Sequence, residues 1–247
     1  MAKSINAGEP TFGTFLGLAS SIAAEVAAVS GADWVLLDLE HGSGGEEQLS
    51  PTIVATKAYG VPTFVRVESA ERIRIGRALD AGAAGVMIPR LENAEQVKTS
   101  VRHFSYPPLG DRGVASYNRA AAWGNNPSAL EPIKRTSAII QIETAGALED
   151  VEQIAAIEGV DILFVGPLDL SYALGLPRDF QNEKFINALK KVVAAANLHG
   201  KIAGILSADA ETAKSHLELG FKFIALSSDS VLLSKALKEN LEEIKGK

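Results

Sequence analysis

The chain has 247 residues, of which 47% are hydrophobic and 22% are charged, and its formal net charge is −6. Lys and Arg are scattered and outnumbered by Asp and Glu, which argues against a nucleic-acid-binding surface. The chain contains no cysteine, so disulfides, thiolate metal sites and cysteine nucleophiles are excluded. No stretch reaches the roughly 18 apolar residues of a membrane span, and the first residues lack the apolar core of a signal peptide. We therefore expect a cytoplasmic protein without a membrane partner.

Eight short apolar runs follow one another along the chain, each with the length and composition of a β-strand. They occupy residues 11–18, 33–39, 62–67, 84–90, 138–143, 161–167, 201–206 and 222–228. Several are almost continuously apolar, as in parallel strands that are buried on both faces. Amphipathic helical patterns alternate with these runs, at residues 20–32, 70–83, 93–104, 182–200, 209–221 and 230–245. Eight such units predict a (β/α)8 TIM barrel, an α/β fold, as a single domain over residues 1–247, rather than a doubly wound open sheet.

Polar side chains collect where the apolar runs end. The fifth run ends in Gln141 and Glu143, which are two residues apart and therefore share one face of the strand. Asp169 follows the sixth run, just after a Gly-Pro turn. In a TIM barrel the active site lies at the carboxyl ends of the strands, so we expect these three side chains to meet there.

Glu143 and Asp169 form a candidate metal site. They follow neighbouring strands, and carboxylate oxygens suit a hard divalent cation such as Mg²⁺ or Mn²⁺. Each acid could instead cap the helix that follows it, because acids are favoured at helix N-termini. Capping explains either residue alone equally well, and the occurrence of the pair favours the metal.

The second and third runs end in Asp38, Glu40, His41 and Arg66. The Asp38-x-x-His41 spacing allows the carboxylate to orient the imidazole as a general base, whereas a lone loop histidine is usually just exposed. A buried guanidinium needs partners, so Arg66 can pair with Asp38 or Glu40, and it can also bind a carboxylate or a developing enolate oxygen. Strands two to six carry no lysine, which disfavours Schiff-base catalysis. We expect the other histidines to be structural: His103, His199 and His216.

Six segments of the chain, in this order, resemble the HpcH/HpaI aldolase family of class II, metal-dependent pyruvate aldolases. They are DLEHG (38–42), VRV (65–67), AGAAGVMIPRLENAEQ (81–96), RGVASYNRA (112–120), IIQIET (139–144) and VGPLDLS (165–171). Each motif alone is moderately specific, and together they cover essentially the whole chain.

The resemblance implies reversible aldol cleavage of a 4-hydroxy-2-oxo acid to pyruvate and an aldehyde, through a metal-bound pyruvate enolate. It implies that Glu143 and Asp169 are ligands of a divalent Mg²⁺, Mn²⁺ or Co²⁺ ion. It also implies that Asp38 and His41 form the proton-transfer dyad and that Arg66 stabilises the enolate. The implied substrate contacts are Arg66, Gln141, Leu206 and the backbone N–H groups of Leu168 and Asp169.

Two departures from the family pattern concern the aldehyde side. Phe15 stands where relatives often carry Trp, and GSGGEE (42–47) stands where several aldolases have a Pro-Asn loop. Oxaloacetate decarboxylation and related enolate-forming C–C lyase or synthase reactions use the same site and stay open as alternatives. A non-catalytic metabolite-binding barrel is a further alternative, against which the retained acids, dyad and arginine argue.

The resemblance further implies a homohexamer, a trimer of dimers in which the last helix is exchanged between subunits. Residues 230–247 are then the oligomerisation helix, although their apolar stripe could also pack on its own barrel. The stripe consists of Val231, Leu232, Leu233, Leu237, Leu241 and Ile244. We also expect the segment containing Arg112, Tyr117, Asn118 and Arg119 to reach the acceptor pocket of its own or a neighbouring subunit.

Overall fold

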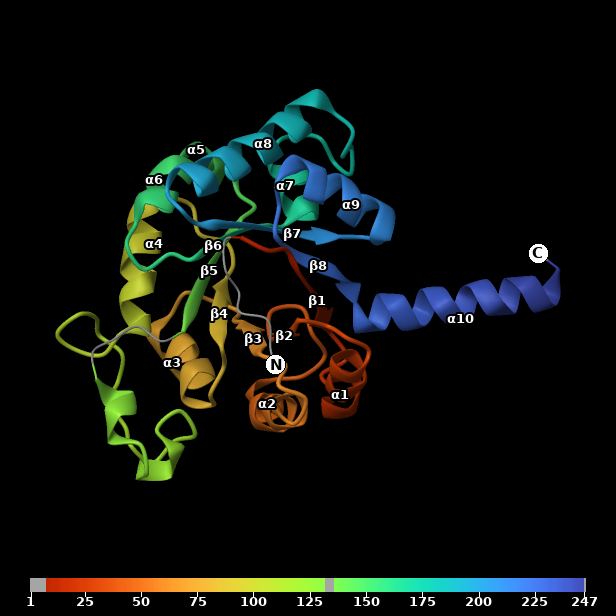
Figure 1. Cartoon of the computed structure of the whole chain (residues 1–247). Helices are drawn as coiled ribbons and strands as arrows, with labels where there is room; N and C mark the ends of the chain where they lie inside the picture. The colour runs from red at the N-terminus through yellow and green to blue at the C-terminus, as the bar shows by residue number, and fades with distance from the viewer. Residues whose placement is uncertain (1–7, 132–135, 247) are drawn as a thin grey trace.

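Eight parallel strands close into a barrel, in the order β1 to β8 (Figure 1). The computed structural model describes residues 8–131 and 136–246, so the outermost residues of the predicted domain lie outside the described part. The strands are β1 (Thr11–Leu16), β2 (Trp34–Asp38), β3 (Thr63–Arg66), β4 (Gly85–Ile88), β5 (Ser137–Ile142), β6 (Ile162–Val165), β7 (Ile202–Ser207) and β8 (Phe223–Ser228). Each strand coincides with one of the predicted apolar runs to within one residue at either end, except where the run continues past the strand, and the TIM-barrel prediction is confirmed.

Helices connect successive strands and cover the outside of the barrel (Figure 1). They are α1 (Ser21–Val29), α2 (Leu49–Lys57), α3 (Arg72–Asp80), α4 (Ala94–Val101), α5 (Ala145–Glu149), α6 (Val151–Ala156), α7 (Pro167–Ala173), α8 (Glu183–Leu198) and α9 (Ala210–Leu219). A last helix, α10 (Asp229–Lys245), follows β8. Side chains of Ser20 and Asp209 accept N–H bonds and so begin α1 and α9. Gly220, in the left-handed conformation that glycine adopts without strain, ends α9.

Side chains that alternate along each strand fill the inside of the barrel. On β5, Ile139 faces inward, while Ala138 and Ile140 belong to the layer between the strands and the helices. Four aromatic rings occupy the middle of the interior, and we call them the aromatic floor: Trp34, Phe64, Phe164 and Phe223. The rings of Trp34 and Phe223 are stacked, with centroids 3.9 Å apart. A Cβ atom at Gly13 would lie 2.2 Å from the Trp34 ring, so a glycine is required there.

The same alternation places polar side chains above the aromatic floor. Arg66 lies two residues beyond Phe64, and Gln141 lies two residues beyond Ile139, so each shares the inward face of its strand. The parallel register sets Asp38 of β2 beside Arg66 of β3. These positions are at the carboxyl ends of the strands, where a TIM barrel carries its active site.

The connection between α4 and β5 extends along the outside of α3 (Figure 1). Its described part contains three short 3₁₀-helices, Arg102–Phe104, Ala122–Gly124 and Pro127–Leu130. Arg112 Nη2 lies 2.6 Å from Asp80 Oδ1, and the side chain of Arg119 packs beside Gly82 at the end of α3. The connection is therefore held on the helical layer.

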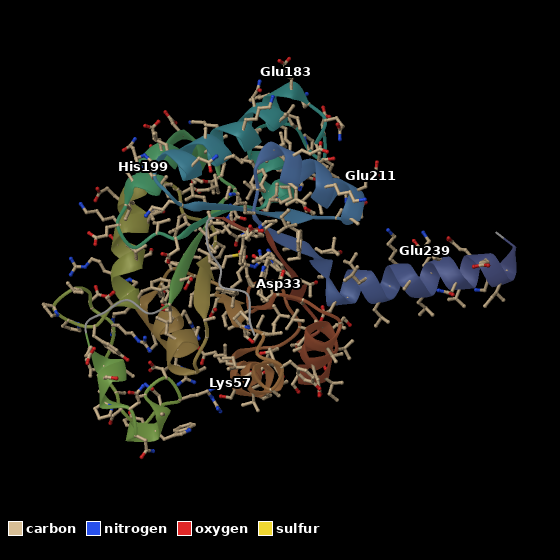
Figure 2. All side chains as sticks on the ribbon, in the orientation of Figure 1. Asp33, Lys57, Glu183, His199, Glu211 and Glu239 are labelled. Carbon is tan, nitrogen blue, oxygen red and sulfur yellow. The ribbon has the colours of Figure 1, made fainter. Side chains whose placement is uncertain are left out.

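The last helix, α10, projects away from the barrel, and Glu239 lies along its projecting part (Figures 1 and 2). Every residue from Val231 to Lys245 is exposed. Throughout residues 8–131 and 136–246, no helix has the length and apolar character needed to cross a membrane.

Candidate active site

A pocket of about 430 Å³ opens at the carboxyl ends of the strands. The predicted site residues that line it are Asp38, His41, Arg66, Gln141, Leu168, Asp169 and Leu206. The remaining predicted residue, Glu143, is buried beside it, where Gln141 Nε2 donates a 2.8 Å hydrogen bond to Glu143 Oε2. The structure thus brings the predicted residues together in one place.

Arg66 is held rigidly on several sides. Its Nε donates to Asp38 Oδ1 at 2.9 Å, and its Nη2 donates to Asp38 Oδ2 at 2.7 Å, which makes a bidentate pair. Its Nη1 lies 3.1 Å from Glu40 Oε2. The guanidinium carbon also lies 5.1 Å from the centre of the Phe15 ring, within cation–π range. The sequence offered Asp38 or Glu40 as the partner of Arg66, and the structure shows both.

Burial acts differently on the two acids that hold Arg66. Burial raises the pKa of Asp38, but the hydrogen bonds and charge of Arg66 outweigh it, so the pKa lies below its usual value. For Glu40, burial outweighs the attraction of Arg66, and its pKa lies above its usual value. Asp38 is therefore the firmly ionised partner of the guanidinium.

The His41 imidazole lies at the opening of the pocket, with 67% of the side chain exposed. Its Nε2 atom is 3.8 Å from Glu40 Oε2. Asp38 Oδ1 instead accepts hydrogen bonds from the backbone N–H groups of Glu40 and His41, at 3.1 and 3.2 Å. Asp38 thus fixes the main chain that carries His41, while Glu40 supplies the carboxylate nearest the ring. The catalytic role of the Asp38–His41 dyad stays a prediction.

Glu143 is buried, and its carboxylate accepts two hydrogen bonds. The backbone N–H of Arg90 donates to Oε1 at 2.9 Å, and Gln141 donates to Oε2. A Cβ atom at position 166 would lie 2.6 Å from Oε2, so the carboxylate requires Gly166. Burial, with the negative charges of Asp169 and Glu40, raises the pKa of Glu143 to about 7. The cap of α5 is Thr144, so the capping alternative for Glu143 is wrong.

Asp169 lies in the first turn of α7, where an acid also suits the helix dipole. Its side chain is 46% exposed, and its Oδ1 atom is 3.4 Å from Arg90 Nη1. Leu168 precedes it in the same turn, so both backbone N–H groups belong to the unsatisfied N-terminus of the helix. The predicted anion contact at this point is compatible with the observed helix.

The residues present fit a divalent cation held by two carboxylates. Within residues 8–131 and 136–246 there is no cluster of three or more His, Cys, Asp or Glu side chains that could hold a metal. A cation held by the predicted ligands Glu143 and Asp169 would therefore take its other ligands from water or substrate. The buried Gln141 Oε1 has no hydrogen-bond partner and could accept a bond from such a water. A cation beside Glu143 would also offset the burial of its carboxylate.

An eight-stranded parallel barrel with acids, an arginine and a histidine at the carboxyl ends of its strands has the architecture of a TIM-barrel enzyme. The sequence model of the HpcH/HpaI aldolase/citrate lyase family matches residues 11–236, and the chain belongs to this family. It is thereby a class II pyruvate aldolase, a carbon–carbon lyase, of a family that is in general metal-dependent.

Two curated relatives and one solved structure illustrate the similarity. The hydroxypyruvate/pyruvate aldolase of Paraburkholderia phytofirmans is 38% identical over 96% of this chain and 94% of its own. The 4-hydroxy-2-oxo-heptane-1,7-dioate aldolase of Escherichia coli is 36% identical over 94% of this chain and 89% of its own. The crystal structure of an HpcH/HpaI aldolase/citrate lyase family protein from Burkholderia cenocepacia has a TM-score of 0.91 at 36% identity, covering 96% and 95% of the two chains.

The other histidines lie outside the pocket, as expected. His103 Nδ1 is 2.6 Å from Asp111 Oδ1 in the helical layer. His216 Nδ1 is 2.8 Å from Ser207 Oγ, and burial lowers the pKa of His216 to about 4, so the ring is neutral at pH 7. His199 follows the C-terminal end of α8 (Figure 2).

One prediction about the pocket is corrected. The segment with Arg112 and Arg119 does not line the pocket of its own subunit, because the ion pair with Asp80 and the packing on Gly82 hold it outside α3. Only its contact with a neighbouring subunit stays a prediction.

The structure also adds pocket residues that the sequence analysis did not assign to the site. Ser227, Ser228, Ser230 and Val231 come from the end of β8 and the start of α10. Arg90 is the last residue of the apolar run at residues 84–90. The spacing of residues in the sequence did not predict its contacts with Glu143 and Asp169.

Proposed function

We propose that this chain cleaves 4-hydroxy-2-oxo acids reversibly to pyruvate and an aldehyde, in the pocket at the carboxyl ends of the strands. The observation that carries the proposal is the immobilised Arg66 guanidinium beside the buried Glu143 carboxylate. An arginine fixed in advance stabilises developing negative charge without reorganisation. The names of the two aldolase relatives support pyruvate as one product.

Glu143 and Asp169 are the residues proposed to hold the divalent ion, Mg²⁺, Mn²⁺ or Co²⁺. When bound, the ion supplies Lewis-acid polarisation of the 2-oxo group. The carboxylate of the substrate is proposed to meet the backbone N–H groups of Leu168 and Asp169 at the start of α7. Gln141 and Leu206 contact the substrate from the polar and apolar sides of the pocket.

Arg66 is proposed to bind the 2-oxo oxygen. A guanidinium has five N–H groups. Asp38 and Glu40 make three nitrogen–oxygen contacts with Arg66, through Nε, Nη2 and Nη1, so N–H groups remain for the substrate. When the C3–C4 bond breaks, its electron pair moves into the C2–C3 bond and the oxygen gains negative charge. Arg66 donates to that oxygen most strongly at this stage.

His41 is proposed as the general base, directly or through a water. Its exposed imidazole removes the proton of the C4 hydroxyl, the C4–O bond becomes a carbonyl, and the aldehyde leaves. Return of a proton to C3 then yields pyruvate. Asp38 keeps the main chain of His41 in place, and Glu40 lies nearest the ring.

We also propose that residues 1–247 form one barrel domain whose residues 230–247 act as the oligomerisation helix of a homohexamer, a trimer of dimers. The exposed apolar side chains of α10 support the exchange of this helix between subunits. An apolar groove of about 690 Å³ at the base of α10 offers a matching surface, which includes Phe12, Leu18, Ile22, Val26 and Leu226. Light scattering tests the assembly.

The function is tested with the metal-stripped and reconstituted protein. Dialysis against EDTA should abolish cleavage of a panel of 4-hydroxy-2-oxo acids, and a divalent ion should restore it. Exchange of the methyl protons of pyruvate in D₂O should follow the same pattern, because it needs the enolate but no aldehyde. Undiminished cleavage by protein shown to be metal-free refutes the mechanism. Faster turnover of oxaloacetate than of every aldol substrate would favour decarboxylation.

A further inference from the structure

Arg90 contacts both acids of the proposed metal site, through different atoms. Its backbone N–H donates to Glu143 Oε1 at 2.9 Å, and its Nη1 lies 3.4 Å from Asp169 Oδ1. The residue follows β4 in the left-handed conformation, with φ of 58°, which is unusual for a side chain other than glycine. Such outliers persist only where the surrounding structure holds them, and they concentrate at functional sites.

We propose that Arg90 is a positioning residue with two opposed effects on metal binding. Its backbone N–H orients the Glu143 carboxylate, whereas its guanidinium competes with the cation for Asp169. This inference rests on the proposed assignment of Glu143 and Asp169 as ligands. It assigns to the side chain a role in tuning metal affinity that is separate from the chemistry at Arg66.

The competition follows from charge and exposure. A guanidinium and a divalent cation both seek the same carboxylate oxygen, and they repel each other when both are close. The Arg90 side chain is 59% exposed and makes a single contact to Asp169, whereas Arg66 is buried and bidentate. Arg90 can therefore leave Asp169 when a cation binds, at the small free energy of an exposed ion pair.

The surroundings of Arg90 offer its side chain a second position. It borders a groove of about 630 Å³ on the side of α3 and α4, and three acids also line this groove: Glu68, Glu71 and Glu95. Glu68 already pairs with Arg74 Nε at 3.0 Å, so Glu71 and Glu95 are the acids that remain for a guanidinium displaced from Asp169. The Arg90 guanidinium therefore still has carboxylate partners within reach when a metal ion displaces it from Asp169.

The test is the affinity of the full-length protein for Mn²⁺, measured by electron paramagnetic resonance of free Mn²⁺, without substrate. Arg90→Met keeps the backbone N–H and the chain length but removes the charge, so the Kd should fall about two- to fivefold. Arg90→Lys keeps a cation and should stay nearer the wild type. The gain from Arg90→Met should shrink at high salt, which screens exposed charges.

Arg178→Met is a matched control, because Arg178 is also exposed and left-handed, with φ of 62°, but lies on the loop after α7. Its Kd should equal that of the wild type. An Arg90→Met variant whose Kd is unchanged or higher, in protein with wild-type circular dichroism, overturns the inference. Glu143→Gln and Asp169→Asn separate the two levels of the argument. If neither weakens Mn²⁺ binding, the proposed metal site fails, whereas weakening by both with no effect of Arg90→Met refutes only the role of Arg90.

Discussion

Replacing Glu143 by Gln should change the pH dependence of stability in the metal-free protein. Burial raises the pKa of Glu143 to about 7, so the native state binds its proton more tightly than the unfolded state, where the ordinary value is 4.5. The native state is therefore favoured most at low pH. The contribution is lost as the pH rises through 7 and the buried carboxylate ionises.

The magnitude follows from these two pKa values. At about 1.4 kcal/mol for each pH unit between them, ionisation of Glu143 costs the native state about 3 kcal/mol of unfolding free energy. Glutamine does not titrate and can keep the local hydrogen bonds. Its Oε1 can accept from the Arg90 N–H, and a flipped Gln141 amide can turn its unpartnered Oε1 to the new Nε2.

The assay is urea denaturation of both proteins with EDTA at pH 5 and pH 8, at one protein concentration. The unfolding free energy of Glu143→Gln minus that of the wild type should rise by about 2–3 kcal/mol from pH 5 to pH 8. The difference between the two proteins isolates this one group from the other titrating residues. A difference that stays constant, or falls, refutes the account of Glu143 as a carboxylate whose burial outweighs its hydrogen bonds.

Three further predictions concern the surroundings of the site and the last helix. Arg66→Lys should lower kcat about 100-fold, because an ammonium cannot reproduce the bidentate pair with Asp38, and wild-type kcat in steady-state assays would contradict this. Asp38→Asn should lower the unfolding free energy by about 3 kcal/mol, since it leaves a buried guanidinium without its main partner, and Glu40→Gln by less. The reverse order in urea titrations would refute the assignment of Asp38 as the principal partner. Deletion of residues 231–247 should reduce the number of subunits per particle, as measured by light scattering. A particle of 26.0 kDa for the full-length protein, the mass of one chain, would contradict the oligomer.

Positions on the strands could be predicted from the sequence because strand geometry has a fixed period. Gln141 follows Ile139 by two residues, so a strand that packs the isoleucine inside must also turn the glutamine inward. The same argument carries Arg66 from Phe64. Convergence of these side chains then follows from closing eight parallel strands into one barrel.

Contacts beyond the strand ends could not be predicted in the same way. Asp38 was paired with the His41 ring by spacing, yet its carboxylate binds the backbone N–H of His41, and the ring lies near Glu40. Past the last strand residue the chain turns, and rotamers decide which acid meets which base. Arg90 shows the same limit, because a left-handed φ redirects its N–H and its side chain, and no periodic pattern encodes that turn.

The aromatic floor has a consequence for the order in which reactants and products enter and leave the pocket. Trp34 stacks on Phe223, and Gly13 packs closely against the indole, so aromatic rings fill the interior of the barrel. Phe164 of the aromatic floor lines the pocket, whose other lining residues lie at or beyond the carboxyl ends of the strands. We expect reactants and products to enter and leave at this end of the barrel, so an aldehyde near His41 would obstruct the departure of pyruvate held beside Glu143. We expect sequential traffic, with the aldehyde released before pyruvate, which product-inhibition kinetics can establish.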